Sequence, residues 1–117
     1  MANPVIHFEV LGKDPQTLQR FYGEAFGWQM QDVMGGSYYM ANPGVDGAIN
    51  GGVGAAPEGG SGHVTFYVGV DDPAAALAKI AELGGRTIQE PMDVPNGPTV
   101  ALFADPEGHV VGLVKGV

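Results

Sequence analysis

Residues 7–28 read HFEVLGKDPQTLQRFYGEAFGW and contain the clearest signals for secondary structure in the chain. Over residues 4–11 apolar side chains alternate with others, which is the period of a β-strand. Asp14 offers an N-cap carboxylate directly before Pro15, a residue favoured at the first helical position. The apolar residues that follow recur at helical spacing until Gly27: Leu18, Phe21, Tyr22 and Ala25. The stretch therefore predicts a strand followed by an amphipathic helix.

Further along, residues 28–33 and 37–41 flank Gly35 and Gly36 in the manner of a β-hairpin, and a weaker strand is expected over residues 48–53. These elements make residues 1–56 a βαβββ module. Residues 56–62, APEGGSG, have the composition of a linker.

The same order then repeats in residues 62–117. A strand is expected over residues 63–70, and Asp72 before Pro73 begins a second helix that ends at Gly84 and Gly85. Further strands are expected over residues 86–88, 99–104 and 110–114, with a proline-rich loop over residues 91–98. One constant shift along the chain lays Val10, Asp14, Pro15 and Gly27 on Val68, Asp72, Pro73 and Gly85. Such repetition indicates two modules that must pair to bury their apolar faces.

The expected fold class is α+β, with two βαβββ modules forming a curved mixed sheet around a cavity. A length of 117 residues suits one domain, residues 1–117. The count of 20 glycines and 9 prolines favours short strands and turns over long helices.

Composition excludes several classes of function. A formal net charge of −8, from 5 basic and 13 acidic residues, would repel a nucleic-acid backbone. No stretch approaches the roughly 20 apolar residues of a membrane span, and the beginning MANPVIHFEV lacks the pattern of a signal peptide. We therefore expect a cytoplasmic protein. Because the chain has no cysteine, a metal ion would need His, Asp, Glu, backbone or water ligands.

Two groups of residues resemble the half-signatures of the vicinal-oxygen-chelate superfamily, the glyoxalase, bleomycin-resistance and dioxygenase type. The first runs from His7 through Asp14 to Phe21-Tyr22 and Phe26-Gly27-Trp28, and the second is the run from Phe103 to Val111, which contains Asp105-Pro106-Glu107-Gly108. The resemblance covers the whole chain and implies this fold. Members of this superfamily include glyoxalases, dioxygenases, epimerases, fosfomycin-modifying enzymes and drug-binding proteins, so the resemblance leaves the activity open among these. It also implies a homodimer, as in the drug-binding branch.

The resemblance also implies one divalent metal with four ligands, one each from the first and last strands of both modules. His7 fills the first of these positions. Thr65 stands at the second, Gly112 replaces the carboxylate of the last strand, and residues 48–53 offer glycines and the amide of Asn50. A four-ligand site cannot be assembled from these residues, so we expect no metal and no other cofactor. A triad of His7, Glu9 and His63 would be the exception, although His63 is more readily explained as a strand-start residue near solvent.

The residues expected to bind a ligand line the predicted cavity: His7, Glu9, Asn50, Thr65 and Tyr67. Gly51, Gly52 and Gly112 are expected to enlarge this pocket, unless they simply allow close packing of strands. His7 and Glu9 could equally form a polar pair that satisfies itself.

We therefore expect a glyoxalase or bleomycin-resistance-like protein that binds a small organic molecule without metal. The alternative is a metal-dependent lyase or isomerase resembling glyoxalase, or a dioxygenase. A metal-free catalyst with Glu9 or His7 as general base, and an accessory domain with a vestigial pocket, also stay open.

Overall fold

The computed structural model describes residues 2–58 and 60–116. Its helices and strands follow one another as βαβββ twice, which confirms the predicted order. The chain divides into two compact units. Residues 7–64 form one, here called the α1 unit; the described residues up to 6 and from 65 onward form the other, the α2 unit. No helix among the described residues is long and apolar enough to cross a membrane.

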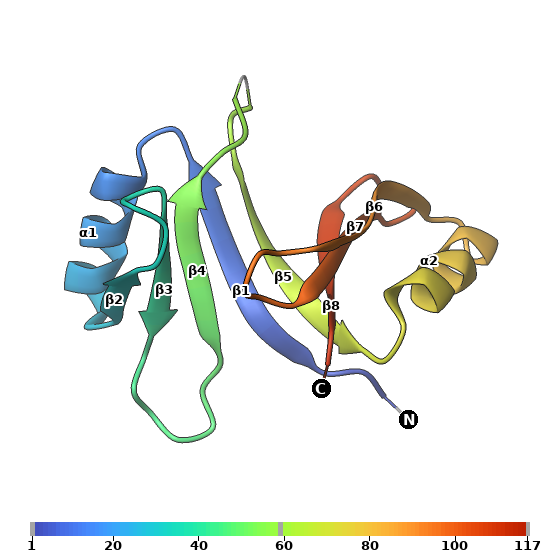
Figure 1. Cartoon of the computed structure of the whole chain (residues 1–117), viewed down its shortest axis with the longest axis horizontal. Coiled ribbons are helices and arrows are strands. Elements are labelled where there is room, and N and C mark those ends of the chain that lie inside the picture. The colour runs from blue at the N-terminus through green and yellow to red at the C-terminus, as the bar shows by residue number, and fades with distance from the viewer. Residues whose placement is uncertain (1, 59, 117) are drawn as a thin grey trace. The chain divides into compact units, whose positions relative to one another are not determined.

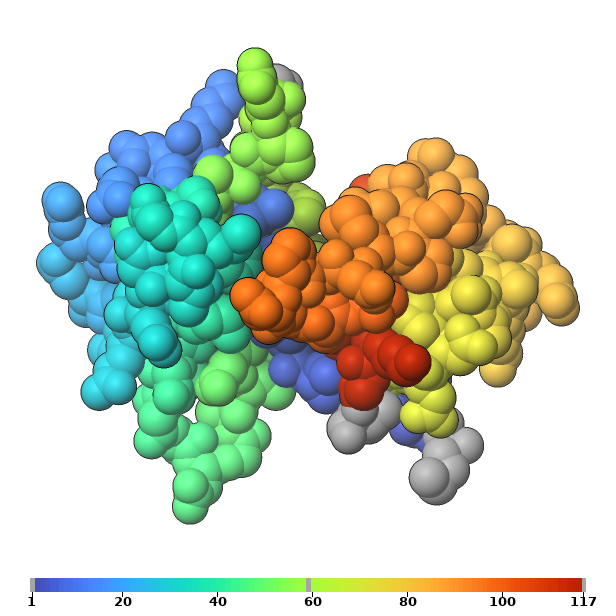
Figure 2. Space-filling model, in the orientation of Figure 1, coloured from blue at the N-terminus to red at the C-terminus, as the bar shows by residue number. Residues whose placement is uncertain are grey.

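The α1 unit is built on four strands in the order β2-β3-β4-β1 (Figure 1). The pair β1–β4 is parallel, and the pairs β2–β3 and β3–β4 are antiparallel. The bounds of the elements are β1 (Val5–Gly12), α1 (Pro15–Phe26), β2 (Gln29–Asp32), β3 (Tyr38–Asn42) and β4 (Asn50–Ala55). The hairpin of β2 and β3, teal in Figure 2, lies at the surface of the unit.

Helix α1 begins and ends on the predicted residues. The carboxylate of Asp14 accepts hydrogen bonds from the backbone N–H of Thr17 (3.1 Å) and from its hydroxyl (2.7 Å), which caps the helix beside Pro15. Gly27 ends it with a φ of 73°, in the left-handed region that glycine adopts without a Cβ penalty. Leu18 and Tyr22 on the apolar side of the helix pack against the buried residues Val10, Ala41 and Val53, as do Phe8, Trp28 and Met30. Of the aromatic residues in the predicted signature, Tyr22 and Trp28 pack against this core, whereas Phe21 and Phe26 are about 60% exposed.

The α2 unit repeats this plan with strands in the order β5-β8-β7-β6. Its elements are β5 (His63–Val70), α2 (Pro73–Glu82), β6 (Arg86–Asp93), β7 (Thr99–Ala104) and β8 (Val110–Lys115). The pair β5–β8 is parallel and the other pairs are antiparallel. A buried cluster of the unit is formed by Val70, Leu77, Ala101 and Leu113, with Val68, Ala76, Ile80 and Phe103 packed against it.

Strand β6 is longer than the sequence predicted. It runs over Arg86–Asp93 and includes Pro91, which we expected in a loop over residues 91–98. β6 is the last strand in the order of its unit, and proline is tolerated on such an edge because no ladder hydrogen bond has to be donated there. The pairing with β7 shifts register twice, between Thr87 and Met92, which accommodates the proline.

Candidate functional site

The two faces of the α1 unit's sheet differ in what covers them. Phe8 and Val10 of β1 belong to the cluster that packs against α1. Because successive side chains of a strand point to opposite faces, His7 and Glu9 lie on the other face, which we call the helix-free face. Pairing in register places Asn50 beside His7 on this face.

Glu9 is the centre of a polar cluster on the helix-free face. The residue is only 8% exposed. Its Oε2 accepts a hydrogen bond from the hydroxyl of Tyr38 (2.9 Å), and its Oε1 lies 2.9 Å from Nε2 of His63. A buried carboxylate is costly unless it is paired and hydrogen-bonded. Tyr38 supplies a hydrogen bond, and His63 supplies the paired charge when its imidazole is protonated.

Tyr38 reaches Glu9 across an intervening strand. It lies on β3, Glu9 lies on β1, and β4 runs between them. In the strand pairing Tyr38 stands opposite Gly54, while Glu9 stands opposite Gly52. A Cβ added at either glycine would overlap the side chain of Tyr38. Because β4 carries no side chain at these two positions, the ring of Tyr38 can lie over this strand and reach Glu9.

His7 completes the cluster. Its Nε2 lies 3.2 Å from the hydroxyl oxygen of Tyr38. The tyrosine hydrogen goes to Glu9, so the geometry requires His7 to donate its Nε2–H to the tyrosine oxygen. Burial lowers the pKa of His7 below its ordinary value of 6.5, and the charge of Glu9 only partly opposes this. His7 is thus a neutral imidazole at neutral pH that uses its Nε2 hydrogen within the protein.

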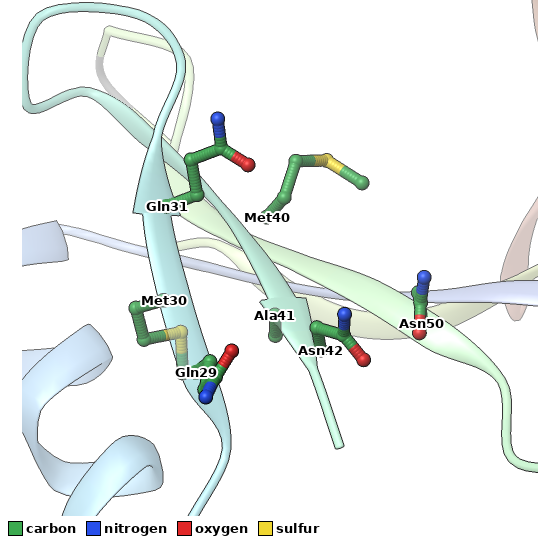
Figure 3. Close-up of a pocket in the computed structure, with 7 residues that line it drawn as sticks. All are labelled: Gln29, Met30, Gln31, Met40, Ala41, Asn42 and Asn50. Atoms are coloured by element: carbon green, nitrogen blue, oxygen red, sulfur yellow. The ribbon is translucent and has the colours of Figure 1, made fainter. Parts of the chain in front are cut away.

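Asn50 adjoins a hollow of the same unit (Figure 3). It is exposed at the beginning of β4, and Asn42 of β3 lies between it and Gln29 of β2. Three of the five residues expected to bind a ligand, His7, Glu9 and Asn50, therefore share the helix-free face of the α1 unit.

The remaining two, Thr65 and Tyr67, belong to the α2 unit. Thr65 is 8% exposed, and its hydroxyl donates to the carbonyl oxygen of Val110 (2.8 Å). Tyr67 pairs in register with Gly112 of β8, and its ring lies over that glycine. Their role in ligand binding stays a prediction.

The glycines do not leave the open space that we expected. A Cβ added to any of the three would overlap an aromatic ring, which comes from Phe8 at Gly51, Tyr38 at Gly52 and Tyr67 at Gly112. Glycine here makes room for a neighbouring ring, which is the close-packing alternative. The prediction that these glycines enlarge the pocket is therefore wrong.

The residues present do not fit the four-ligand metal site that the superfamily resemblance implies. The Nε2 of His7 is engaged with the hydroxyl of Tyr38, so a metal ion at this nitrogen would have to replace that contact. Thr65 gives its hydroxyl hydrogen to a backbone carbonyl, and tyrosine rings fill the space at Gly52 and Gly112. In residues 2–58 and 60–116 there is no group of three His, Asp or Glu side chains that could hold a metal ion.

Sequence reasoning missed Tyr38 and left two interpretations of His63 open, a strand-start residue near solvent or a partner of His7 and Glu9. Tyr38 was not singled out, and the signal that could have revealed it is glycine at positions 52 and 54, two apart on one face of the middle strand. The side chain of His63 is 27% exposed, and it forms an ion pair with Glu9 when the imidazole is protonated.

The sequence of the chain is similar to those of known proteins. The model of the Glyoxalase/Bleomycin resistance protein/Dioxygenase superfamily matches residues 5–113. The protein named "Putative glyoxylase CFP32" of Mycobacterium bovis is 29% identical over 109 residues, which cover 92% of this chain. The chain spans 42% of the length of that relative.

Solved structures show the same fold at low identity. A glyoxalase/bleomycin resistance protein/dioxygenase superfamily member from Vibrio splendidus has a TM-score of 0.66 at 15% identity, covering 98% of this chain and all (100%) of that one. Methylmalonyl-CoA epimerase from Mycobacterium tuberculosis has a TM-score of 0.67 at 14% identity, covering 97% of this chain and 87% of the epimerase. Because the family model matches nearly the whole chain, the chain belongs to the Glyoxalase/Bleomycin resistance protein/Dioxygenase superfamily.

Proposed function

We propose that the α1 unit binds a small organic molecule on its helix-free face without the help of a metal ion. The observation that carries the proposal is the carboxylate of Glu9, held at one oxygen by Tyr38 and at the other by His63. These contacts fix polar groups on the sheet before a ligand arrives. Few but well-placed polar groups of this kind orient ligands in small-molecule sites.

The exposure of the cluster supports access from solvent. The side chain of His63 is 27% exposed and that of Glu9 is 11% exposed. A ligand that covers the helix-free face could therefore contact the imidazole of His63 directly and the carboxylate at its edge.

The hydrogen bonds of His7 support a metal-free mode of binding. Its Nε2–H faces the oxygen of Tyr38, so a metal could take this nitrogen only after the contact is broken and the imidazole changes tautomer. Of the positions that the superfamily uses for ligands, His7 is the one that carries a competent side chain here.

A second candidate function is catalysis, and the same cluster carries it. Glu9 lies 2.9 Å from both Tyr38 and His63, so a proton that the carboxylate took could pass on to the imidazole of His63. A metal-free lyase or isomerase would use Glu9 to take a proton from its substrate. A metal-dependent lyase, isomerase or dioxygenase would need ligands in addition to His7.

One variant separates binding from catalysis. Thermal-shift screening of an organic compound library, followed by calorimetry, should first find a ligand. Glu9→Gln keeps the shape of the side chain and removes its charge. For a binder we expect an affinity about threefold to tenfold lower; for an enzyme that uses this base, turnover should fall about a hundredfold or more.

The control is His109→Gln, which removes an exposed imidazole paired with Asp105 at 2.9 Å in the other unit. It should leave ligand affinity unchanged. If Glu9→Gln and His109→Gln bind equally well, the cluster is not the binding site.

We further propose that two chains form a homodimer, as the superfamily resemblance implies, and that the protein acts in the cytoplasm without a nucleic-acid partner. The net charge of −8 supports the last point. Light scattering after size-exclusion chromatography tests the dimer, since a mass near 12.1 kDa would contradict it.

A further inference from the structure

A hollow of about 310 Å³ opens on the α1 unit (Figure 3). Gln31 and Met40 lie together at one end of it, and Gln29 and Asn42 lie toward the other, in keeping with their pairing between β2 and β3. Asn50 borders it from β4. Four of the side chains around the hollow are therefore carboxamides.

Strand pairing connects the hollow to the cluster. Gln31 pairs with Met40, Met40 pairs with Gly52, and Gly52 pairs with Glu9. These four residues form one row across the sheet, and the row is on the helix-free face because it ends in Glu9. Gly52 and the end of the Tyr38 ring that lies over it thus separate Met40 from the carboxylate, and a ligand of moderate size could touch both places.

The chemistry of the lining selects a neutral ligand. A carboxamide offers an N–H donor and a carbonyl acceptor without net charge. The described strand residues of the α1 unit contain no lysine or arginine that could pair with an anion. The Oδ1 of Asn42 already accepts the backbone N–H of Gly44 (2.8 Å), so this residue would meet a ligand with its NH₂ group.

Met40 adds a preference for a flat ring. A thioether makes favourable contacts with aromatic rings at their edges and adapts its shape to them. Amide side chains also pair through two hydrogen bonds with a ring edge that has a donor beside an acceptor.

We propose that this hollow holds the neutral, planar part of the ligand, a heterocyclic ring with an N–H donor beside a carbonyl acceptor, while the cluster around Glu9 contacts the rest. This inference rests on the proposed function and names the class of ligand for the same face.

Uracil is the probe, because it presents donors and acceptors around a neutral ring, and orotate is the matched probe with an added carboxylate. Each is titrated into ¹⁵N-labelled protein while the side-chain NH₂ signals of the four carboxamides are followed by NMR. A fragment of this size is expected to bind with a Kd on the order of 1 mM. Uracil should shift signals of Gln29, Gln31, Asn42 and Asn50, and orotate should bind about fivefold more weakly because of its charge.

Gln31→Leu tests the hollow itself. It should weaken uracil binding about threefold to tenfold through the loss of one hydrogen-bonding group, and Gln89→Leu, on β6 of the other unit, should leave it unchanged. The inference is overturned if orotate binds as tightly as uracil, if the two leucine variants behave alike, or if no carboxamide signal moves. Shifts confined to the backbone amide signals of His7, Glu9 and His63 would overturn the inference as well, yet would leave the proposed function standing. The proposed function fails separately, if no screened compound perturbs the helix-free face.

Discussion

The hydroxyl of Tyr38 occupies the space that a Cβ on residue 52 would need, so Gly52 and Tyr38 are complementary in volume. We expect Gly52→Ala to displace the tyrosine ring from β4 and to break its hydrogen bond to Glu9. Forcing extra volume into a packed site costs about 1–3 kcal/mol. Urea denaturation should show this loss in the free energy of unfolding with an unchanged m-value.

A double-mutant cycle isolates the pair. In a Tyr38→Ser background the ring is gone, so Gly52→Ala should cost much less there than in the natural chain. Equal costs in both backgrounds would mean that the tyrosine is not the obstacle.

The order of elements could be predicted because its signals are local. Asp14 and Asp72 each precede a proline and cap a helix, as the sequence indicated. The partners of Glu9 could not be predicted in this way, because Tyr38 and His63 lie 29 and 54 residues away along the chain. Periodicity assigns a residue to a face of a sheet, but it does not say which side chains meet on that face.

The glycines show the same difference between local and long-range signals. Their positions on the strands were correctly placed, since Gly52 and Gly112 fall within β4 and β8. Whether a missing side chain leaves a void or receives a ring depends on the neighbouring strand, and that neighbour is fixed only by the pairing.

The lowered pKa of His7 gives the stability of the protein a pH dependence. Burial holds this pKa below 6.5 in the folded state, so near and below that pH the unfolded chain binds more protons than the folded chain. The free energy of unfolding should therefore decrease as the pH falls through 6.5, and it should be highest above that value. Urea denaturation between about pH 5 and pH 8 measures the slope.

His7→Gln tests this assignment because it keeps a side-chain N–H for Tyr38 and removes the titration. The variant should lose part of the slope below pH 6.5, whereas His109→Gln should keep it. A slope that is identical in both variants and in the natural protein would show that other groups cause it.

The cap of helix α2 provides a prediction for the other unit. The carboxylate of Asp72 accepts the backbone N–H groups of Ala74 (3.0 Å) and Ala75 (3.2 Å). Asp72→Ala leaves both donors to water and should lower the free energy of unfolding by about 1 kcal/mol. Asp72→Asn keeps a capping oxygen and should therefore retain most of the stability that the cap provides. An alanine variant as stable as the asparagine variant would contradict the role of the cap.

Metal content tests the disagreement between this chain and the ligand pattern that its superfamily resemblance implies. Because the Nε2–H of His7 is directed to Tyr38 and tyrosine rings fill the space at Gly52 and Gly112, we expect protein purified without chelator to carry no stoichiometric metal. Titration with zinc, nickel, manganese or iron should give no tight binding in calorimetry, and EDTA should leave the melting temperature unchanged.

Adventitious binding through the exposed His109 would persist in His7→Ala and disappear in His109→Gln. Stoichiometric metal with the opposite dependence, lost in His7→Ala and kept in His109→Gln, would mean that Tyr38 releases His7 when a metal arrives. The metal-dependent alternative would then replace metal-free binding, with Glu9 and His63 as the next ligands to test.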